Sequence, residues 1–209
     1  MFQLSQPIAF SGEVSIRFDE ENASHAIGHI CFVRMKRVTG PMGRTILITG
    51  GARSGKSRIA EARALGFGPR ATYIATGEPR DTEMAARIAV HQARRGEGWV
   101  THEEPLDLIG ALAVTDGQGA RLIDCLTLWL TNLMLGGHDW QAACRALVAV
   151  LPHQSDPVVI VTNEVGAGIV PENALAREFR DAAGLLNQWV AAVADEVVLA
   201  VAGLPLRVK

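Results

Sequence analysis

Short apolar runs alternate with amphipathic or alanine-rich stretches along most of the chain. The runs that predict strands are 45–49, 71–75, 99–101, 121–124, 157–162, 196–202 and a final short run at 206–208. The stretches that predict helices are 57–65, 81–95, 106–114, 126–135, 140–151 and 172–194. The Val- and Ile-rich runs do not alternate with polar residues, which is typical of strands covered on both faces. Strands interleaved with helices predict an α/β fold with a mostly parallel sheet flanked by helices, and we expect the last run to add an antiparallel edge strand.

Residues 1–44 do not share this pattern. They have no clear hydrophobic period, and Ser, Gly, Asp, Glu and Asn dominate their beginning. The order of a signal peptide, with a positive start, an apolar stretch and a small-residue cleavage site, is not found there. We therefore predict a poorly ordered N-terminal extension over residues 1–44 and a single domain over residues 45–209.

Removing residues 1–41 should leave activity and melting temperature nearly unchanged, because this segment has no core-forming pattern. The measurement compares the activity and the thermal melting of the truncated and full-length proteins. A large loss of soluble protein on truncation would show that the segment is structural.

The composition narrows the class of protein. The chain has 209 residues, of which 48% are hydrophobic and 20% charged, and its formal net charge is −2. A nucleic-acid-binding protein is usually basic, so we expect no nucleic-acid partner. No apolar run is long enough to span a membrane. The three cysteines form no CxxC pair, which argues against a disulfide framework or a structural zinc site and favours a cytoplasmic protein.

A phosphate-binding loop follows the first predicted strand. The segment matches G-x-x-x-x-G-K-[ST] without a mismatch and consists of Gly50, Gly51, Ala52, Arg53, Ser54, Gly55, Lys56 and Ser57. A strand precedes it and a helix follows, which is the context that the motif requires. Lys56 is expected to reach the outer phosphates of a nucleotide, and Ser57 to bind Mg²⁺. The alternative is a glycine-rich turn with a chance lysine.

A carboxylate ends the predicted strand at 121–124. In P-loop proteins, an acid in this position binds Mg²⁺. Asp124 is therefore predicted to serve the nucleotide bound at the loop. The alternative is that Asp124 caps the helix that follows.

One histidine lies near the end of the helix at 81–95. Arg94 and Arg95 follow His91 at helical spacing and share its face. Neighbouring guanidinium groups would keep the imidazole neutral and nucleophilic. They would also neutralise phosphate charge during a transfer. From spacing alone, a histidine at a helix C-terminus beside a solvated arginine pair is the simpler interpretation.

Four motifs in this order resemble one enzyme family. They are the loop at 50–57, Arg87-Ile-x-x-His91, Trp99-x-Thr101-x-Glu103-x-Pro105, and the run Thr-Asn-Glu-Val-Gly-Ala-Gly-Ile-Val-Pro at 162–171. Together they resemble the bifunctional adenosylcobinamide kinase / adenosylcobinamide-phosphate guanylyltransferase family of cobalamin biosynthesis, over about residues 45–209. The last run is the most specific of the four, whereas the loop alone occurs in many proteins.

The resemblance implies two reactions and the residues that serve them. Members phosphorylate adenosylcobinamide with ATP or GTP and then transfer GMP from GTP to that phosphate through a covalent guanylyl-histidine, which matches His91 here. It also implies a P-loop fold, Mg²⁺ and a homotrimer. Beyond the loop, the matching nucleotide contacts are Ala75, Thr76, Gly77, Gln92, Ala93, Arg94, Arg95, Glu103 and Asp124.

Two alternatives to the bifunctional enzyme stay open at the level of sequence. One is a simple P-loop kinase of a small metabolite, with a structural His91. The other is a nucleotide-binding switch or a DNA-dependent ATPase, and the net charge argues against binding to DNA. The loop after residue 162 has two interpretations: Glu164 orients a nucleotide or corrinoid group, or the glycines there only form a tight turn.

Overall fold

The computed structural model describes residues 43–209, without the side chains of Glu83, Met84, Arg87, His91 and Arg94. The predictions for residues 1–42 lie outside the described residues. Gly43 and Arg44, which the sequence placed in the extension, contact the fold. The amide of Gly43 donates to the carbonyl of Gln154 at 2.7 Å, and the Arg44 guanidinium lies 3.1 Å from the carboxylate of Glu196.

Strands and helices alternate in the predicted order. They are β1 (Thr45–Thr49), α1 (Lys56–Leu65), β2 (Ala71–Ala75), α2 (Thr82–Arg94), β3 (Trp99–Glu103), α3 (Leu108–Thr115), β4 (Ala120–Asp124), α4 (Leu126–Leu135), α5 (Trp140–Val150), the 3-10 turn η1 (Leu151–His153), β5 (Val158–Val161), α6 (Ala174–Val193), β6 (Glu196–Val201) and β7 (Leu204–Arg207). Two helices start later than predicted because Asp107 and Asn173 cap their first turns.

The strands form one seven-stranded sheet in the order β3-β2-β4-β5-β1-β6-β7. Every neighbouring pair is parallel except β6 and β7. This confirms the mostly parallel sheet and its antiparallel C-terminal edge. The tight turn between β6 and β7 uses positive φ at Ala202 and Gly203, which suits a two-residue hairpin.

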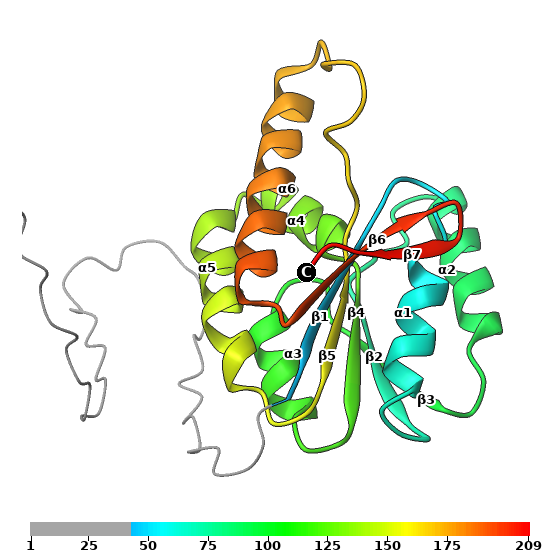
Figure 1. Cartoon of the computed structure of the whole chain (residues 1–209). Coiled ribbons are helices and arrows are strands. Elements are labelled where there is room, and N and C mark those ends of the chain that lie inside the picture. The colour runs from blue at the N-terminus through cyan, green and yellow to red at the C-terminus, as the bar shows by residue number, and fades with distance from the viewer. Residues whose placement is uncertain (1–42) are drawn as a thin grey trace, which may run out of the picture. The chain divides into compact units, whose positions relative to one another are not determined.

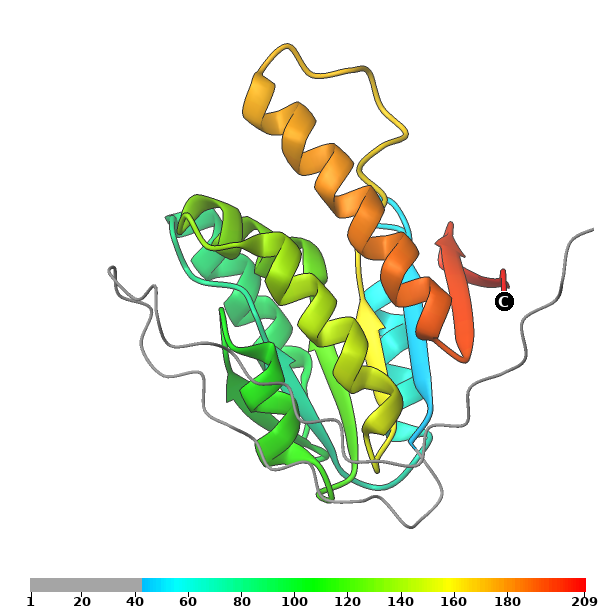
Figure 2. The ribbon, with the colours of Figure 1, turned by 90° about the vertical axis from the view of Figure 1, so that its left-hand side faces the viewer.

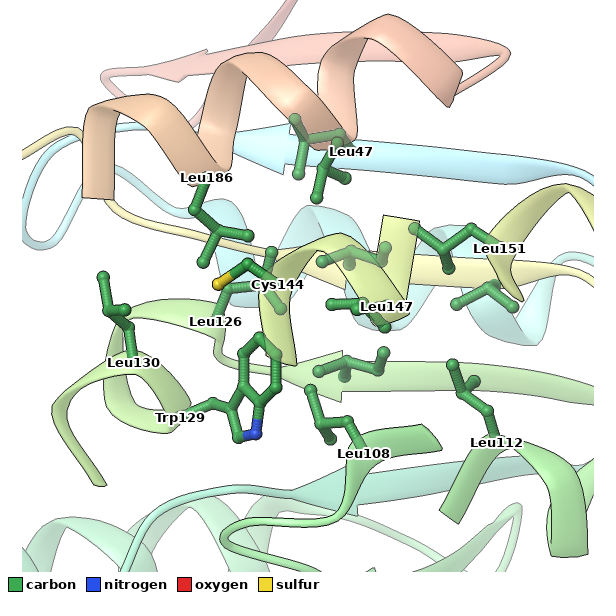
Figure 3. Packing of buried hydrophobic residues seen from close by; sticks show 14 of the residues in the cluster. Leu47, Leu108, Leu112, Leu126, Trp129, Leu130, Cys144, Leu147, Leu151 and Leu186 are labelled. Carbon is green, nitrogen blue, oxygen red and sulfur yellow. The ribbon is translucent and has the colours of Figure 1, made fainter. Parts of the chain in front are cut away.

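Helices cover both faces of the sheet (Figure 1). On one side, α1 packs against the central strands through Ala60 and Ala64. On the other side, α3, α4, α5 and α6 bury a larger apolar cluster around Trp129 (Figure 3). Strands β1 and β5 are buried along their whole length, as their unbroken apolar runs predict.

Helix α6 is longer than the sheet requires. Its N-terminal half and the loop before it extend beyond the carboxyl ends of the strands (Figure 2). No helix within residues 43–209 is long and apolar enough to cross a lipid bilayer.

Candidate active site

The loop at 50–57 connects β1 to α1, as predicted. Arg53 and Gly55 have positive φ angles of 56° and 92°, so the backbone of the loop curls through the left-handed region at these two residues. The side chain of Lys56 is buried, and its Nζ donates to the carbonyl of Gly51 at 2.9 Å. The lysine is therefore folded back over the loop that would hold the phosphates.

The N-terminus of α1 is open to an anion. Gly55 is its N-cap and provides no side chain for the first-turn N–H groups. By contrast, Asp107, Asp139 and Asn173 cap α3, α5 and α6 with side-chain oxygens. The buried hydroxyl of Ser54 has no hydrogen-bond partner among the described residues. N–H groups without a side-chain cap and a buried hydroxyl without a partner both fit a bound phosphate.

The turn between β6 and β7 supports the loop from behind. The amide of Gly203 donates to the carbonyl of Ser54 at 2.9 Å. A Cβ on Gly55 would lie only 2.9 Å from the Cα of Gly203. The second glycine of the motif is therefore required by close packing as well as by its positive φ.

Asp124 ends β4 and is held by a buried tyrosine. The hydroxyl of Tyr73 donates to Oδ2 of Asp124 at 2.7 Å. Burial raises the pKa of the Tyr73 phenol well above its usual range, and the carboxylate of Asp124 raises it further. The phenol therefore stays protonated and remains a donor. The helix-capping alternative is not supported, because the N-cap of α4 is Cys125 and no side chain caps it.

Three residues that are predicted to contact the nucleotide are in register at the ends of neighbouring strands. Ala75 on β2 is in register with Glu103 on β3 and with Asp124 on β4.

Thr76 is fully buried, and its hydroxyl exchanges hydrogen bonds with the backbone of Cys125. Thr76 thus fixes the end of β2 against β4, and its side chain is engaged inside the protein. A Cβ on Gly77 would lie 3.2 Å from Leu128 on α4.

Helix α2 carries His91, and its C-terminal end lies beside Tyr73. The side chains of His91 and Arg94 lie outside the described set, while Gln92 and Ala93 are exposed. The guanidinium of Arg95 lies 3.8 Å from the centre of the Tyr73 ring. The structure therefore links the end of the histidine-bearing helix to the tyrosine that holds Asp124.

The run at 162–164 joins the phosphate loop to α6. The amide of Glu164 donates to the carbonyl of Gly50 at 3.1 Å. Its Oε1 accepts from the hydroxyl of Thr49 at 2.5 Å and from Nδ2 of Asn187 at 3.3 Å. Of the two sequence-level interpretations, a tight turn alone does not explain this side-chain network.

Two residues of the site have no signal in the sequence. Tyr73 was one apolar position in a buried strand, and only the pairing of β2 with β4 places its hydroxyl at Asp124. Asn187 lies mid-helix in α6, and its contacts with Thr162 and Glu164 depend on how that helix packs.

A known enzyme family matches the chain over nearly all of the described residues. Residues 46–208 match the family model described as cobinamide kinase / cobinamide phosphate guanyltransferase. The chain belongs to this family. The match covers the whole sheet except the first residue of β1, so the motifs and the fold point to the same group.

Curated relatives of the family are similar over nearly their whole length. The bifunctional adenosylcobalamin biosynthesis protein CobU of Salmonella typhimurium is 49% identical over 182 residues, which is 78% of this chain and 99% of that protein. CobP of Pseudomonas aeruginosa is 45% identical over 167 residues, covering 78% of this chain and 96% of that protein. The Escherichia coli CobU is 45% identical over 181 residues, with coverages of 78% and 99%.

A solved structure supports the fold alone. A prototypical ATPase from the type III secretion system of pathogenic bacteria aligns with a TM-score of 0.50 and 12% identity, over 79% of this chain and 57% of that one. Together with the phosphate loop and the strand order, this confirms the P-loop NTPase-like fold.

Proposed function

We propose that this enzyme phosphorylates adenosylcobinamide with ATP or GTP and then transfers GMP from GTP to the new phosphate through His91. Membership in the family supports the two reactions. The observation that supports one site for both reactions is the chain of contacts from Arg95 through Tyr73 to Asp124. It links the end of the His91 helix to the carboxylate that would serve the phosphate loop.

For the kinase reaction, the loop would hold the nucleotide phosphates against α1 and Lys56. The hydroxyl of Ser57 and the carboxylate of Asp124 are hard oxygen donors, which suit Mg²⁺. A bound Mg²⁺ neutralises charge that develops on the phosphates during transfer. We infer that Lys56 supplies the point cation and that Tyr73 keeps Asp124 oriented toward the metal.

For the transferase reaction, His91 would attack the α-phosphorus of GTP and release pyrophosphate. A phosphate oxygen of adenosylcobinamide phosphate would then attack the phosphoramidate and regenerate the histidine. We infer that the nucleotide also contacts the residues that the resemblance singled out around this helix and the strand ends, namely Ala75, Gly77, Gln92, Ala93, Arg94, Arg95 and Glu103. Thr76, which the resemblance also singled out, is fully buried, so its role would be to hold the end of β2 in place.

Product analysis with separate nucleotides tests the proposal. The purified protein is incubated with adenosylcobinamide and ATP, and GTP is added in a second step. The expected products are adenosylcobinamide phosphate after the first step, then adenosylcobinamide-GDP and pyrophosphate. A simple kinase would stop at the first product, and a nucleotide switch would form neither, so either outcome would contradict the proposal.

Replacing Tyr73 with phenylalanine should weaken the binding of Mg²⁺ without abolishing it. The variant leaves Asp124 without the hydroxyl that orients it. Losing such a partner of a metal ligand typically lowers metal affinity about 10–100-fold, so the Mg²⁺ concentration at half-maximal kinase rate should rise roughly tenfold or more. Thr115→Val is the matched control, because it removes a buried hydroxyl that bonds within α3. An unchanged Mg²⁺ dependence in Tyr73→Phe would contradict the role given to Asp124.

We also expect the homotrimer that the resemblance implies. Ile169, Val170 and Leu175, in and just after the loop before α6, are exposed apolar residues, and Ile169 is 96% exposed. Such a surface suits contact with a second copy of the chain. Light scattering of the purified protein at micromolar concentration measures this directly, and a monomeric mass would contradict it.

A further inference from the structure

The order of the strands places the end of β5 between the two halves of the nucleotide site. Strand β5 lies between β1, which leads into the phosphate loop, and β4, which ends at Asp124. Val161 is in register with Ile48 on one side and with Asp124 on the other. The residues that follow Val161 therefore emerge between the loop and the predicted metal-binding carboxylate.

Of the three residues that emerge there, only Glu164 presents an exposed ionisable group. Thr162 is fully buried, and its hydroxyl donates to Asn187 at 2.7 Å. Asn163 turns to α4 and donates to the hydroxyl of Thr127 at 2.5 Å. Glu164 is exposed. The position beside the phosphate loop is thus occupied by an exposed glutamate.

Hydrogen bonds hold the carboxylate on the loop side of the site. Its backbone is bonded to Gly50, and both donors that contact its side chain, Thr49 and Asn187, bond to Oε1. Oε2 receives no hydrogen bond from the described residues, so it is available to a donor on a substrate. None of these contacts involves α2, so the position of Glu164 does not depend on the helix that carries His91.

We propose that Glu164 accepts the proton of the substrate hydroxyl in the kinase reaction; this rests on the function proposed above. The hydroxyl oxygen forms a bond to the γ-phosphorus, and the bond from that phosphorus to the bridging oxygen breaks with its electron pair leaving on the nucleoside diphosphate. The hydroxyl proton moves to Oε2 of Glu164 and is then released to water. Every atom and charge in this step is supplied by the substrate alcohol, the nucleotide and the carboxylate.

The guanylyl transfer does not need this base. Its acceptor is a phosphate oxygen, which is already ionised at neutral pH, so no proton has to be removed from it. A general base typically contributes about 10²–10⁴-fold to a rate. Glu164 should therefore matter for one reaction and not for the other, which a purely structural residue beside the shared loop would not do.

The test uses Glu164→Gln in the full-length protein, with the two reactions assayed separately. The kinase kcat should fall about 10²–10³-fold while KM for ATP and for adenosylcobinamide stays within about threefold. Guanylyl transfer to supplied adenosylcobinamide phosphate, which uses no general base, should stay within about twofold of wild type. Glu172→Gln, a neutralised exposed glutamate in the same loop, is the control and should change neither reaction.

Three results would overturn the assignment. They are a kinase kcat close to wild type in Glu164→Gln, an equal loss of both reactions, or a loss confined to KM. If the Gln variant folds poorly, Glu164→Asp keeps a carboxylate and should show a smaller loss that is still confined to the kinase; equal losses there would also overturn it. Failure of the wild-type protein to form either product would instead reject the proposed function.

Discussion

Replacing His91 with alanine should abolish the covalent guanylyl adduct and lower guanylyl transfer by roughly 10⁴-fold or more. The loss is this large because the residue is the proposed nucleophile, and no second route to the intermediate remains. The kinase reaction should stay within about tenfold of wild type, since direct phosphoryl transfer needs no protein nucleophile. Alanine favours helices, so α2 should be retained.

The measurement for His91 is retention of label on the denatured protein after incubation with α-labelled GTP, together with separate assays of the two reactions. His102 on β3 is the nearest other histidine in the sequence, so His102→Ala is the matched control and should keep the adduct. An adduct that persists in His91→Ala and disappears in His102→Ala would move the nucleophile to β3. Loss of both reactions in folded His91→Ala protein would mean that the half-reactions share this residue.

Replacing Lys56 with alanine should reduce both reactions at least about 10³-fold. Its ammonium is buried in the curl of the phosphate loop beside the carbonyl of Gly51. A buried point cation is worth far more than an exposed one because water screens it less. The loss should appear as weaker nucleotide binding and as a lower rate, since the lysine serves both bound and transferring phosphates.

The control for Lys56 is Arg180→Ala, which removes a cation on α6 that pairs with its neighbour Asp181 at 3.5 Å. Nucleotide affinity is measured by calorimetry, and each reaction by product formation. If Lys56→Ala binds GTP as tightly as wild type and keeps its kinase rate, the assignment of the loop is wrong.

The central strands were predictable because β1, β2, β4, β5 and β6 are buried along most of their length. An unbroken apolar run such as Val158–Val161 leaves few alternatives to a central strand. The boundaries shifted where side chains cap helices, as at Asp107 and Asn173. The order of the strands could not be predicted, because it depends on contacts between residues far apart in the sequence.

The first residues that the structure describes show the same limit. Arg44 has no local pattern, yet it lies 3.1 Å from Glu196, 152 positions further along the chain. Glu196 is buried, and its Oε1 also lies 2.6 Å from Nη2 of Arg63. The sequence around Arg44 gives no sign of this distant partner. The predicted boundary therefore left Gly43 and Arg44 outside the domain that they contact.

The site was predictable where a motif fixes backbone geometry and unpredictable where side chains meet across strands. The phosphate loop needs a strand, a helix and glycines in sequence, all of which are local. The contacts of Tyr73 with Asp124 and of Glu164 with Thr49 form only when β2, β4, β5 and β1 are aligned. Those long-range contacts carry the proposals on metal orientation and proton transfer.

A pulse–chase experiment tests the central claim, that one chain passes GMP through a covalent intermediate to a phosphorylated corrinoid. The protein is first labelled with α-labelled GTP, freed of unbound nucleotide and then mixed with adenosylcobinamide phosphate. We predict that the label leaves the protein and appears in adenosylcobinamide-GDP in a single turnover, with no further GTP present. Label that stays on the protein during the chase, or a protein that never becomes labelled, would contradict the claim.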